Sequence, residues 1–267
     1  MYKKITLLAL LALSLNSFAE STDLQQAINS SHRSAEHKAR DIYRHPEKTL
    51  EFFALQPNMT VVEIWPGSQA WYTEILAPYL KDHGKLYAAH FDKNSTSPYL
   101  VKSLAQFKQK IAANPEIYDK VITTTLTTSG QLKIAPDNSA DRILTFRNVH
   151  NWMNSGRAKN VFKTMYQALK PGGILGVVEH RNPENIEQDL TAPSGYVTEA
   201  YVIQLANKAG FKLAAKSEIN ANPKDTHIHP HGVWSLPPSL RGDATNKTNF
   251  IAIGESDRMT LKFIKPE

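Results

Sequence analysis

The most constraining feature of the sequence is a regular alternation of two kinds of segment downstream of Pro57. Short runs rich in β-branched residues alternate with longer amphipathic runs of helical length. The expected strands cover residues 60–65, 85–90, 120–126, 141–146, 174–179, 212–219 and 259–264. The expected helices cover residues 69–80, 99–113, 158–169 and 197–209, and Pro171-Gly172-Gly173 is expected to end the third of them. Strands joined by helical crossovers form parallel sheets, so the sequence predicts an α/β fold with a mostly parallel seven-stranded sheet and helices on both faces.

Two segments differ from this pattern. Residues 20–57 are mostly polar good helix formers interrupted at Pro46, and they predict a helical segment that precedes the α/β domain of residues 58–267. Residues 220–257 are rich in Pro, His and Asn and predict an irregular insertion before the last strand. Long loops on a regular scaffold are usually functional or disordered.

Residues 1–19 have the pattern of a secretory signal peptide. Lys3 and Lys4 precede an apolar run over residues 5–15, and small residues before position 20 favour cleavage after Ala19. The apolar run is shorter than the roughly 20 residues that a membrane-spanning helix needs. We therefore expect a periplasmic or secreted protein with a cleaved signal peptide and without stable membrane insertion. An uncleaved anchor is the alternative.

The composition excludes several classes of function. The chain has no cysteine, which rules out disulfides, a thiolate nucleophile and a zinc–thiolate site. Its formal net charge of +6 includes Lys3 and Lys4 of the expected signal peptide, and no basic block stands out. A nucleic-acid partner is therefore not expected.

The turn after the first expected strand holds the first candidate binding residues. Glu63 lies near the end of that strand, and Gly67 follows in a tight turn before a helix. Doubly wound sheets hold nucleoside cofactors in this way, and Asp92 closes the second strand, where a carboxylate can accept hydrogen bonds from ribose hydroxyls. Taken alone, the turn fits an ordinary strand-to-helix connection equally well.

Several strings along the chain carry a resemblance to a known family. They are Arg40-Asp41, Tyr43-Arg44-His45-Pro46, Glu63-Ile64-Trp65-Pro66-Gly67, Trp71-Tyr72-Thr73-Glu74-Ile75-Leu76-Ala77-Pro78, Phe146-Arg147-Asn148-Val149-His150-Asn151-Trp152, Leu169-Lys170-Pro171-Gly172-Gly173, Val178-Glu179-His180-Arg181 and Gly232-Val233-Trp234-Ser235-Leu236-Pro237-Pro238. Together they resemble a family of exported class I S-adenosylmethionine-dependent methyltransferases, over nearly the whole chain after the expected signal peptide. The string from Leu169 is common to class I methyltransferases broadly, whereas the strings around Trp65 and His150 are specific to this family.

The resemblance implies a Rossmann-like class I methyltransferase fold and methyl transfer from S-adenosylmethionine to an unidentified small molecule. The residues that we expect to bind the cofactor are Glu63, Trp65, Gly67, Asp92 and Asn148. The chain departs from the common pattern of three alternating glycines, because Trp65, Gly67 and Gln69 occupy those positions and only the middle glycine is present. Backbone that approaches a ligand closely tolerates Cβ atoms poorly. A non-catalytic exported module for ligand binding or sensing on the same fold is therefore the alternative.

The turn after the fourth expected strand carries the best candidate for a catalytic base. His150 lies at the carboxyl edge of the sheet, and an imidazole titrates in the working range. Asn148 on the same turn could hold the substrate or the cofactor amine. The alternative for His150 is a histidine that only packs against Trp152. Glu179 and His180 close the fifth strand at the same edge, where we expect either of them to support the binding residues.

The N-terminal segment contributes two further catalytic candidates through the resemblance, which implies that this segment folds across the cofactor edge as a lid. Tyr43, Arg44 and His45 lie on this segment, and lid residues there would shield the transferred methyl group from water. Of these, Tyr43 and His45 are the catalytic candidates. The alternative is a helix corner in which Arg44 and Asp41 pair on the surface.

Three histidines alternate in the insertion. His227, His229 and His231 would share one face of an extended strand, as three ligands of a divalent metal would. Pro230 interrupts the ladder, and packed or solvated loop histidines are the favoured interpretation, so no metal site is expected.

Overall fold

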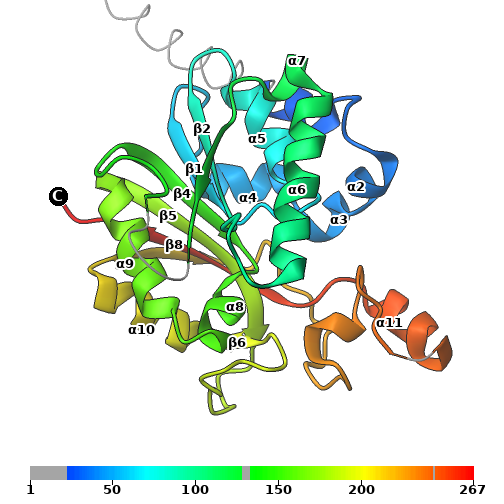
Figure 1. The fold of residues 1–267 in the computed structure, drawn as a ribbon. Helices are drawn as coiled ribbons and strands as arrows, with labels where there is room; N and C mark the ends of the chain where they lie inside the picture. Colours follow the sequence, from blue (N-terminus) through cyan, green and yellow to red (C-terminus); the bar gives the residue numbers. More distant parts are fainter. Residues whose placement is uncertain (1–22, 128–132, 243) are drawn as a thin grey trace, which may run out of the picture.

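The structure is a computed structural model that describes residues 23–127, 133–242 and 244–267 (Figure 1). The expected signal peptide, residues 1–19, lies outside the described residues. Over the described ranges, no helix combines the length and the apolar character that crossing a membrane requires.

A mixed sheet forms the centre of the molecule. Its strands are β1 (Thr60–Ile64), β2 (Lys85–His90), β3 (Ile122–Thr125), β4 (Ala140–Phe146), β5 (Leu169–Asn182), β6 (Val197–Thr198), β7 (Lys212–Ser217) and β8 (Arg258–Ile264). Their order is β3-β2-β1-β4-β5-β8-β7, with the short β6 paired to β5. The first five strands run parallel, and β8 runs antiparallel to both β5 and β7. The seven expected strands are confirmed, and β6 is an addition.

Helices cover both faces of this sheet, as predicted (Figure 1). The N-terminal helices are residues 23–29, α2 (Ala35–Ala39), α3 (Asp41–Arg44) and α4 (Pro46–Phe52). The crossover helices are α5 (Thr73–Leu80), α6 (Pro98–Ala113), α7 (Pro115–Tyr118), α8 (Val149–Asn154), α9 (Ala158–Ala168) and α10 (Glu199–Ala209). The insertion contains two 3-10 turns, η1 (Gly232–Ser235) and η2 (Ala244–Asn246), and the helix α11 (Lys247–Ile253).

Several helix boundaries differ from the expectation, and two of the differences have a clear structural reason. Helix α5 begins at Thr73 rather than at residue 69, because Ala70 takes a left-handed φ of 53° that an α-helix does not accommodate. Helix α9 ends at Ala168, and β5 starts at the next residue, where Leu169 pairs with Ala140. The expectation that Pro171-Gly172-Gly173 ends this helix is therefore wrong, because these residues lie inside β5.

The strand pleat sorts the apolar side chains into two cores. Val61 and Val62 are adjacent and fully buried, yet they belong to opposite cores because successive strand residues point to opposite faces. Val62 packs with α9 and α10 through residues such as Phe162 and Leu205. The core around Val61 is closed by the N-terminal helices and α5, through side chains such as Leu50, Phe53 and Ile75. Burial on both faces is what a parallel strand between helical layers requires.

The N-terminal helices are tied to α5 by polar contacts as well. The backbone carbonyl of His37 accepts a hydrogen bond from Trp71 Nε1 at 3.1 Å. The Nδ1 atom of the His37 imidazole lies 2.8 Å from Glu74 Oε2. Arg33 is buried and binds both oxygens of Asp41, at 2.7 and 2.9 Å. Asp41 therefore pairs with Arg33 and not with Arg44, so the surface Arg44–Asp41 pair is not found.

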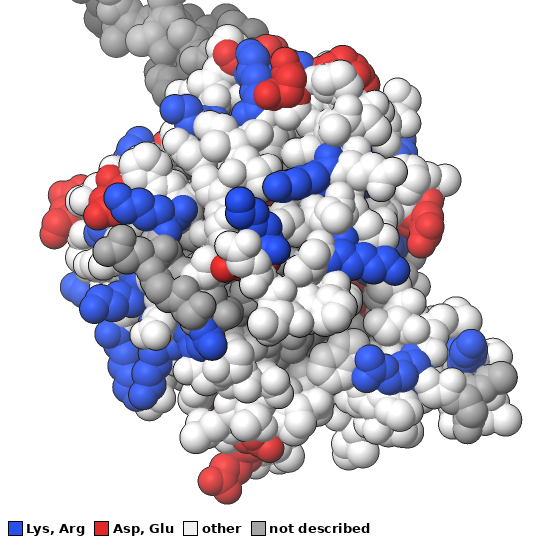
Figure 2. Space-filling model, in the orientation of Figure 1, with Lys and Arg blue, Asp and Glu red and all other residues white. Residues whose placement is uncertain are grey.

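Charged side chains are distributed over the surface without one continuous basic band on the face drawn in Figure 2. There Lys and Arg side chains lie in several separate groups, with Asp and Glu side chains among them.

The packing of the N-terminal segment on the sheet can be tested at Gly176 in β5. A Cβ atom at this position would lie 2.7 Å from Cγ of the fully buried Phe53. We expect Gly176→Ala to lower the free energy of unfolding by about 1–3 kcal/mol, the usual cost of overpacking, in urea denaturation. Phe53→Leu should reduce that cost in a double-mutant cycle. Equal costs in both backgrounds would show that Phe53 does not pack on β5.

Candidate functional site

A cavity of about 660 Å³ opens at the carboxyl edge of the parallel strands. Six segments line it: the turn after β1, the stretch after β2 into α6, the stretch from the end of β4 through α8, the end of β5, the N-terminal helices and the insertion. The lining residues used below are Arg40, Arg44, Glu63, Trp65, Gly67, Phe91, Arg147, Asn148, His150, His180, Trp234 and Glu255. This edge is where doubly wound sheets bind ligands, and the volume is that of a small-molecule site.

The turn after β1 keeps a glycine-like backbone although two of the usual glycines are absent. Trp65 has a φ of 48° and Gly67 a φ of 72°, both in the left-handed region. A Cβ atom at Gly67 would meet no atom within 4 Å, so this backbone faces open space in the cavity. A bulky residue with positive φ is strained, and such strain concentrates at functional sites.

The indole of Trp65 is fixed by its surroundings. Its Nε1 donates to the carbonyl of Leu126 at 3.4 Å, and its ring centroid lies 4.8 Å from that of Phe91 and 5.8 Å from that of Trp152. The side chain thus spans the ends of β2 and β3. These contacts hold the strained backbone in place.

Glu63 is a buried acid beside this turn. Its Oε2 accepts a hydrogen bond from Thr73 Oγ1 at 2.6 Å. Burial raises the pKa of Glu63 to about 7, although the Thr73 hydroxyl and the charge of Arg147 oppose the shift. A carboxyl group poised in this range, in a cavity wall, is suited to a cationic ligand group, because such a group would favour its ionised form.

Asn148 joins the two central strands. Its Nδ2 donates to the carbonyl of Ile64 at 2.9 Å and lies 3.2 Å from Thr145 Oγ1. The structure therefore brings Asn148 together with Glu63, Trp65, Gly67 and His150 around one cavity.

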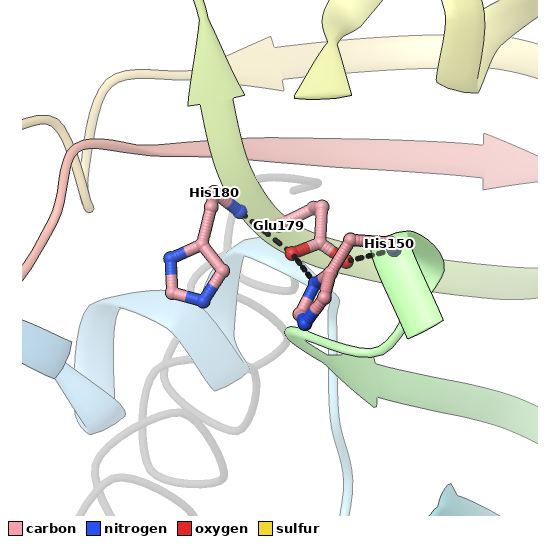
Figure 3. A group of neighbouring side chains, drawn as sticks. All are labelled: His150, Glu179 and His180. Carbon is pink, nitrogen blue, oxygen red and sulfur yellow. Dashed lines mark hydrogen bonds and ion pairs between the residues drawn. The ribbon is translucent and has the colours of Figure 1, made fainter. Parts of the chain in front are cut away.

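His150 is oriented by Glu179 (Figure 3). The imidazole lies at the start of α8, and its Nδ1 is 3.0 Å from Glu179 Oε1. The same carboxylate accepts hydrogen bonds from the backbone N–H groups of Val149, His150 and His180. A carboxylate only accepts, so we assign the ring proton to Nδ1, which leaves the lone pair of Nε2 free. His150 therefore does more than pack against Trp152.

His180 lies beside this pair, with its ring centroid 5.3 Å from that of His150. Its Nδ1 is 2.5 Å from Ser256 Oγ, which connects β5 to the end of the insertion. Burial lowers the pKa of His180 well below its usual range, and the charges of Arg147 and Arg44 add to the shift.

The ligand atoms of His150, Glu179 and His180 lie within 4.8 Å of one another, a spacing that could hold a metal ion. Both oxygens of Glu179 already accept hydrogen bonds, however, and positive charge from Arg44 and Arg147 reaches His180. The arrangement therefore fits a hydrogen-bonded acid–base pair better than a site for a divalent cation.

The histidines of the insertion do not converge. His227 Nε2 lies 3.3 Å from Asp257 Oδ2, whereas His229 Nε2 lies 2.8 Å from the buried Asp225. The His231 side chain lies near Gly242 instead. Their contacts are those of packed loop histidines.

Three predicted site residues do not line the cavity. Asp92 follows Phe91, and its Oδ1 accepts a hydrogen bond from the backbone N–H of Asn94 at 2.9 Å. The ring of Tyr43 lies against Gly254, and His45 forms the left-handed corner between α3 and α4 with a φ of 40°. The N-terminal segment reaches the cavity through Arg40 and Arg44 instead.

An arginine cluster around Glu255 was not predicted from the sequence. Arg40 Nε donates to Glu255 Oε1 at 2.7 Å, Arg44 Nε lies 3.1 Å from Oε2, and Arg258 Nη1 lies 3.1 Å from Oε2. Burial alone would raise the pKa of Glu255, but the charges of Arg44, Arg258 and Arg40 lower it to about 2. The spacing of Arg40 and Arg44, four residues apart in a helical segment, was the available signal. Nothing in the sequence indicated the distant Glu255 as their partner.

The protonation of Glu63 gives a pH-dependent prediction. Its pKa is raised from 4.5 to about 7 in the folded protein, so the unfolded chain loses this proton first and the folded state loses stability as the pH rises through that range. We expect Glu63→Gln to have little effect near pH 4.5 and to raise the free energy of unfolding by up to about 3 kcal/mol above pH 7. Urea denaturation of the ligand-free protein at both pH values measures this. A change in the free energy of unfolding of the same size at both pH values would contradict the raised pKa of Glu63.

Comparisons with known proteins place the fold. No family model matches the sequence, and no curated protein matches it. Solved structures do match. A SAM dependent methyltransferase from Aquifex aeolicus is 19% identical with a TM-score of 0.51, over 75% of this chain and 93% of the other. A putative sarcosine dimethylglycine methyltransferase from Galdieria sulphuraria is 14% identical with a TM-score of 0.56, over 86% and 85%. The [4+2]-cyclase SpnF is 15% identical with a TM-score of 0.56, over 94% of each chain.

Identities this low show the fold alone. Together with the strand order, they establish that this chain has the Rossmann-like fold of class I S-adenosylmethionine-dependent methyltransferases.

Proposed function

We propose that the protein transfers a methyl group from S-adenosylmethionine to a small molecule. The observation that carries the proposal is the left-handed turn at Trp65 and Gly67, whose backbone opens onto the cavity that also holds His150. The expected export of the chain, which rests on residues 1–19, is part of the proposal. A periplasmic or secreted methyltransferase would need its cofactor outside the cytoplasm.

The residues present fit this cofactor. Gly67 leaves room for close approach, Glu63 offers a carboxyl group to an amine, and Trp65 and Phe91 supply aromatic faces. Asp92 would have to turn its carboxylate towards the cavity to accept from ribose hydroxyls. Bound S-adenosylmethionine would supply an electrophilic methyl group, with the electrons of the broken C–S bond remaining on sulfur.

The chain's own contribution is to position the acceptor and remove its proton. His150 Nε2 has the free lone pair that would take the proton from an acceptor O–H or N–H group as its oxygen or nitrogen bonds to the methyl carbon. Glu179 would hold the ring in this tautomer and stabilise the imidazolium that forms. Trp234 lies with its ring centroid 5.9 Å from that of His150, so the insertion would help to exclude water.

A non-catalytic binding module is the second candidate. Two observations favour it: the Trp65 indole spans the ends of β2 and β3, and Asp92 lies outside the cavity. The SpnF structure, named as a [4+2]-cyclase, also shows that the same fold serves another reaction.

Calorimetric titration of S-adenosylmethionine and S-adenosylhomocysteine tests the proposal, and Gly67 provides a controlled variant. Gly67→Ala should weaken S-adenosylhomocysteine binding at least about tenfold, because a Cβ atom would enter the space that the cofactor needs. Gly172→Ala is the matched control. Gly172 has a φ of 74°, close to that of Gly67, but lies near the start of β5 at the other end of the sheet. Absence of binding at millimolar ligand would refute the methyltransferase proposal.

His150 provides a prediction about catalysis rather than binding. We expect His150→Ala to leave S-adenosylhomocysteine affinity within about twofold and to slow methyl transfer about 10²–10⁴-fold, the usual contribution of a general base. Transfer of a tritiated methyl group to screened small-molecule acceptors measures the rate. A variant that loses cofactor affinity but keeps transfer would overturn the assigned role.

A further inference from the structure

The cavity wall carries more positive charge than its own carboxylates can balance. Among the lining residues, Arg40 and Arg44 contact the single carboxylate of Glu255, and the charge of Arg147 acts on it. The same carboxylate also binds Arg258, which does not line the cavity. The only other acid among the described lining residues is Glu63, whose pKa is about 7. Buried charges are costly unless they are paired, so this excess requires a partner.

Three of the guanidinium groups each have a nitrogen without a hydrogen-bond partner. These buried atoms are Nη2 of Arg40, Nη1 of Arg44 and Nη1 of Arg147, and all three residues line the cavity. Arg44 is only 2% exposed, and its guanidinium carbon lies 4.7 Å from the centre of the Trp71 ring, so its position is fixed by packing. Burial lowers the pKa of Arg147 to about 10, opposed by the charge of Glu255. Most buried donors have a hydrogen-bond partner, so each unpartnered donor here requires an explanation.

The residues that carry these donors line the same cavity as the candidate base. Arg147 directly follows β4 in a left-handed conformation with a φ of 62° and begins the turn that leads to His150. Glu255 continues into Ser256, whose hydroxyl contacts His180. The arginine cluster and the pair of His150 and His180 are thus linked through the adjacent residues Glu255 and Ser256.

We propose that the cavity binds an anionic group of the methyl acceptor, a carboxylate or a phosphate, with the free guanidinium nitrogens of Arg40, Arg44 and Arg147. Guanidinium groups match the geometry of both anions and bind them by charge-assisted hydrogen bonds. The anion would anchor the acceptor while its nucleophilic atom faces His150 Nε2. Only the identity of the ligand as acceptor rests on the proposed function; the anion site itself does not.

Inorganic phosphate is the probe, titrated calorimetrically into the purified protein in chloride buffer. We expect one phosphate per chain. Arg147→Gln and, independently, Arg40→Gln should each weaken phosphate binding about tenfold, which is the loss expected for one charge-assisted hydrogen bond. Lys208→Gln is the control, because it removes one positive charge at an exposed position on α10. Circular dichroism confirms that each variant is folded. No phosphate binding, or an equal loss in Lys208→Gln, would overturn the proposal.

A second arm separates the acceptor from the cofactor as the source of the anion. S-adenosylhomocysteine carries a carboxylate, whereas 5′-methylthioadenosine does not. If the site serves the acceptor, phosphate binds together with S-adenosylhomocysteine, and Arg147→Gln leaves the ratio of the two nucleoside affinities within about twofold. Competition between phosphate and S-adenosylhomocysteine, with a selective loss of S-adenosylhomocysteine affinity in Arg147→Gln, would assign the arginines to the cofactor and overturn the inference. Arginine-dependent phosphate binding without any nucleoside binding would keep the anion site and refute the methyltransferase proposal.

Discussion

The contacts of Glu255 hold the cavity together. Its carboxylate, 4% exposed, binds Arg40 and Arg44 from the N-terminal helices and Arg258 at the start of β8, while Glu255 itself ends the insertion. Two regions that are far apart in the sequence, the N-terminal helices and the stretch from Glu255 to Arg258, therefore meet at one charge. Removing one partner of such a buried network leaves uncompensated charge, which is strongly destabilising. The N-terminal segment is consequently a wall of the site, fixed by electrostatics, rather than a loosely attached lid.

A second buried carboxylate, Glu179, holds the surroundings of His150 in place in the same way. By accepting hydrogen bonds from the backbone at the start of α8 and from the ring of His150, it fixes both the end of β5 and the tautomer of the imidazole. The two networks touch where Ser256 contacts His180. The cavity thus has a basic side around Arg147, where we propose that an anion binds, and His150, which we propose as the proton acceptor. Both depend on the parallel sheet, which brings the ends of β1, β4 and β5 to one edge.

The sequence predicted the fold well because strand and helix periodicity is a local property. It also placed Asn148 and His150 at the carboxyl edge, since their position follows from strand order alone. It did not predict that Trp65 adopts the backbone of the missing glycine, because that depends on the packing of the indole against Phe91 and Leu126. The sequence also did not predict the role of Glu255, because its partner Arg44 lies more than two hundred residues away in the chain. For Asp92 the sequence predicted the place in the chain but not the side-chain contact, since its carboxylate accepts a hydrogen bond within its own loop.

The central claim is that the turn around Gly67 accepts a nucleoside cofactor despite its incomplete glycine pattern. A crystal structure of the protein grown with S-adenosylhomocysteine tests this most directly. We expect the ligand to lie along the backbone of Trp65 and Gly67, with its amine near Glu63 and its sulfur facing His150. A cavity that stays free of ligand at saturating concentration, with the Trp65 indole still spanning the ends of β2 and β3, would contradict it.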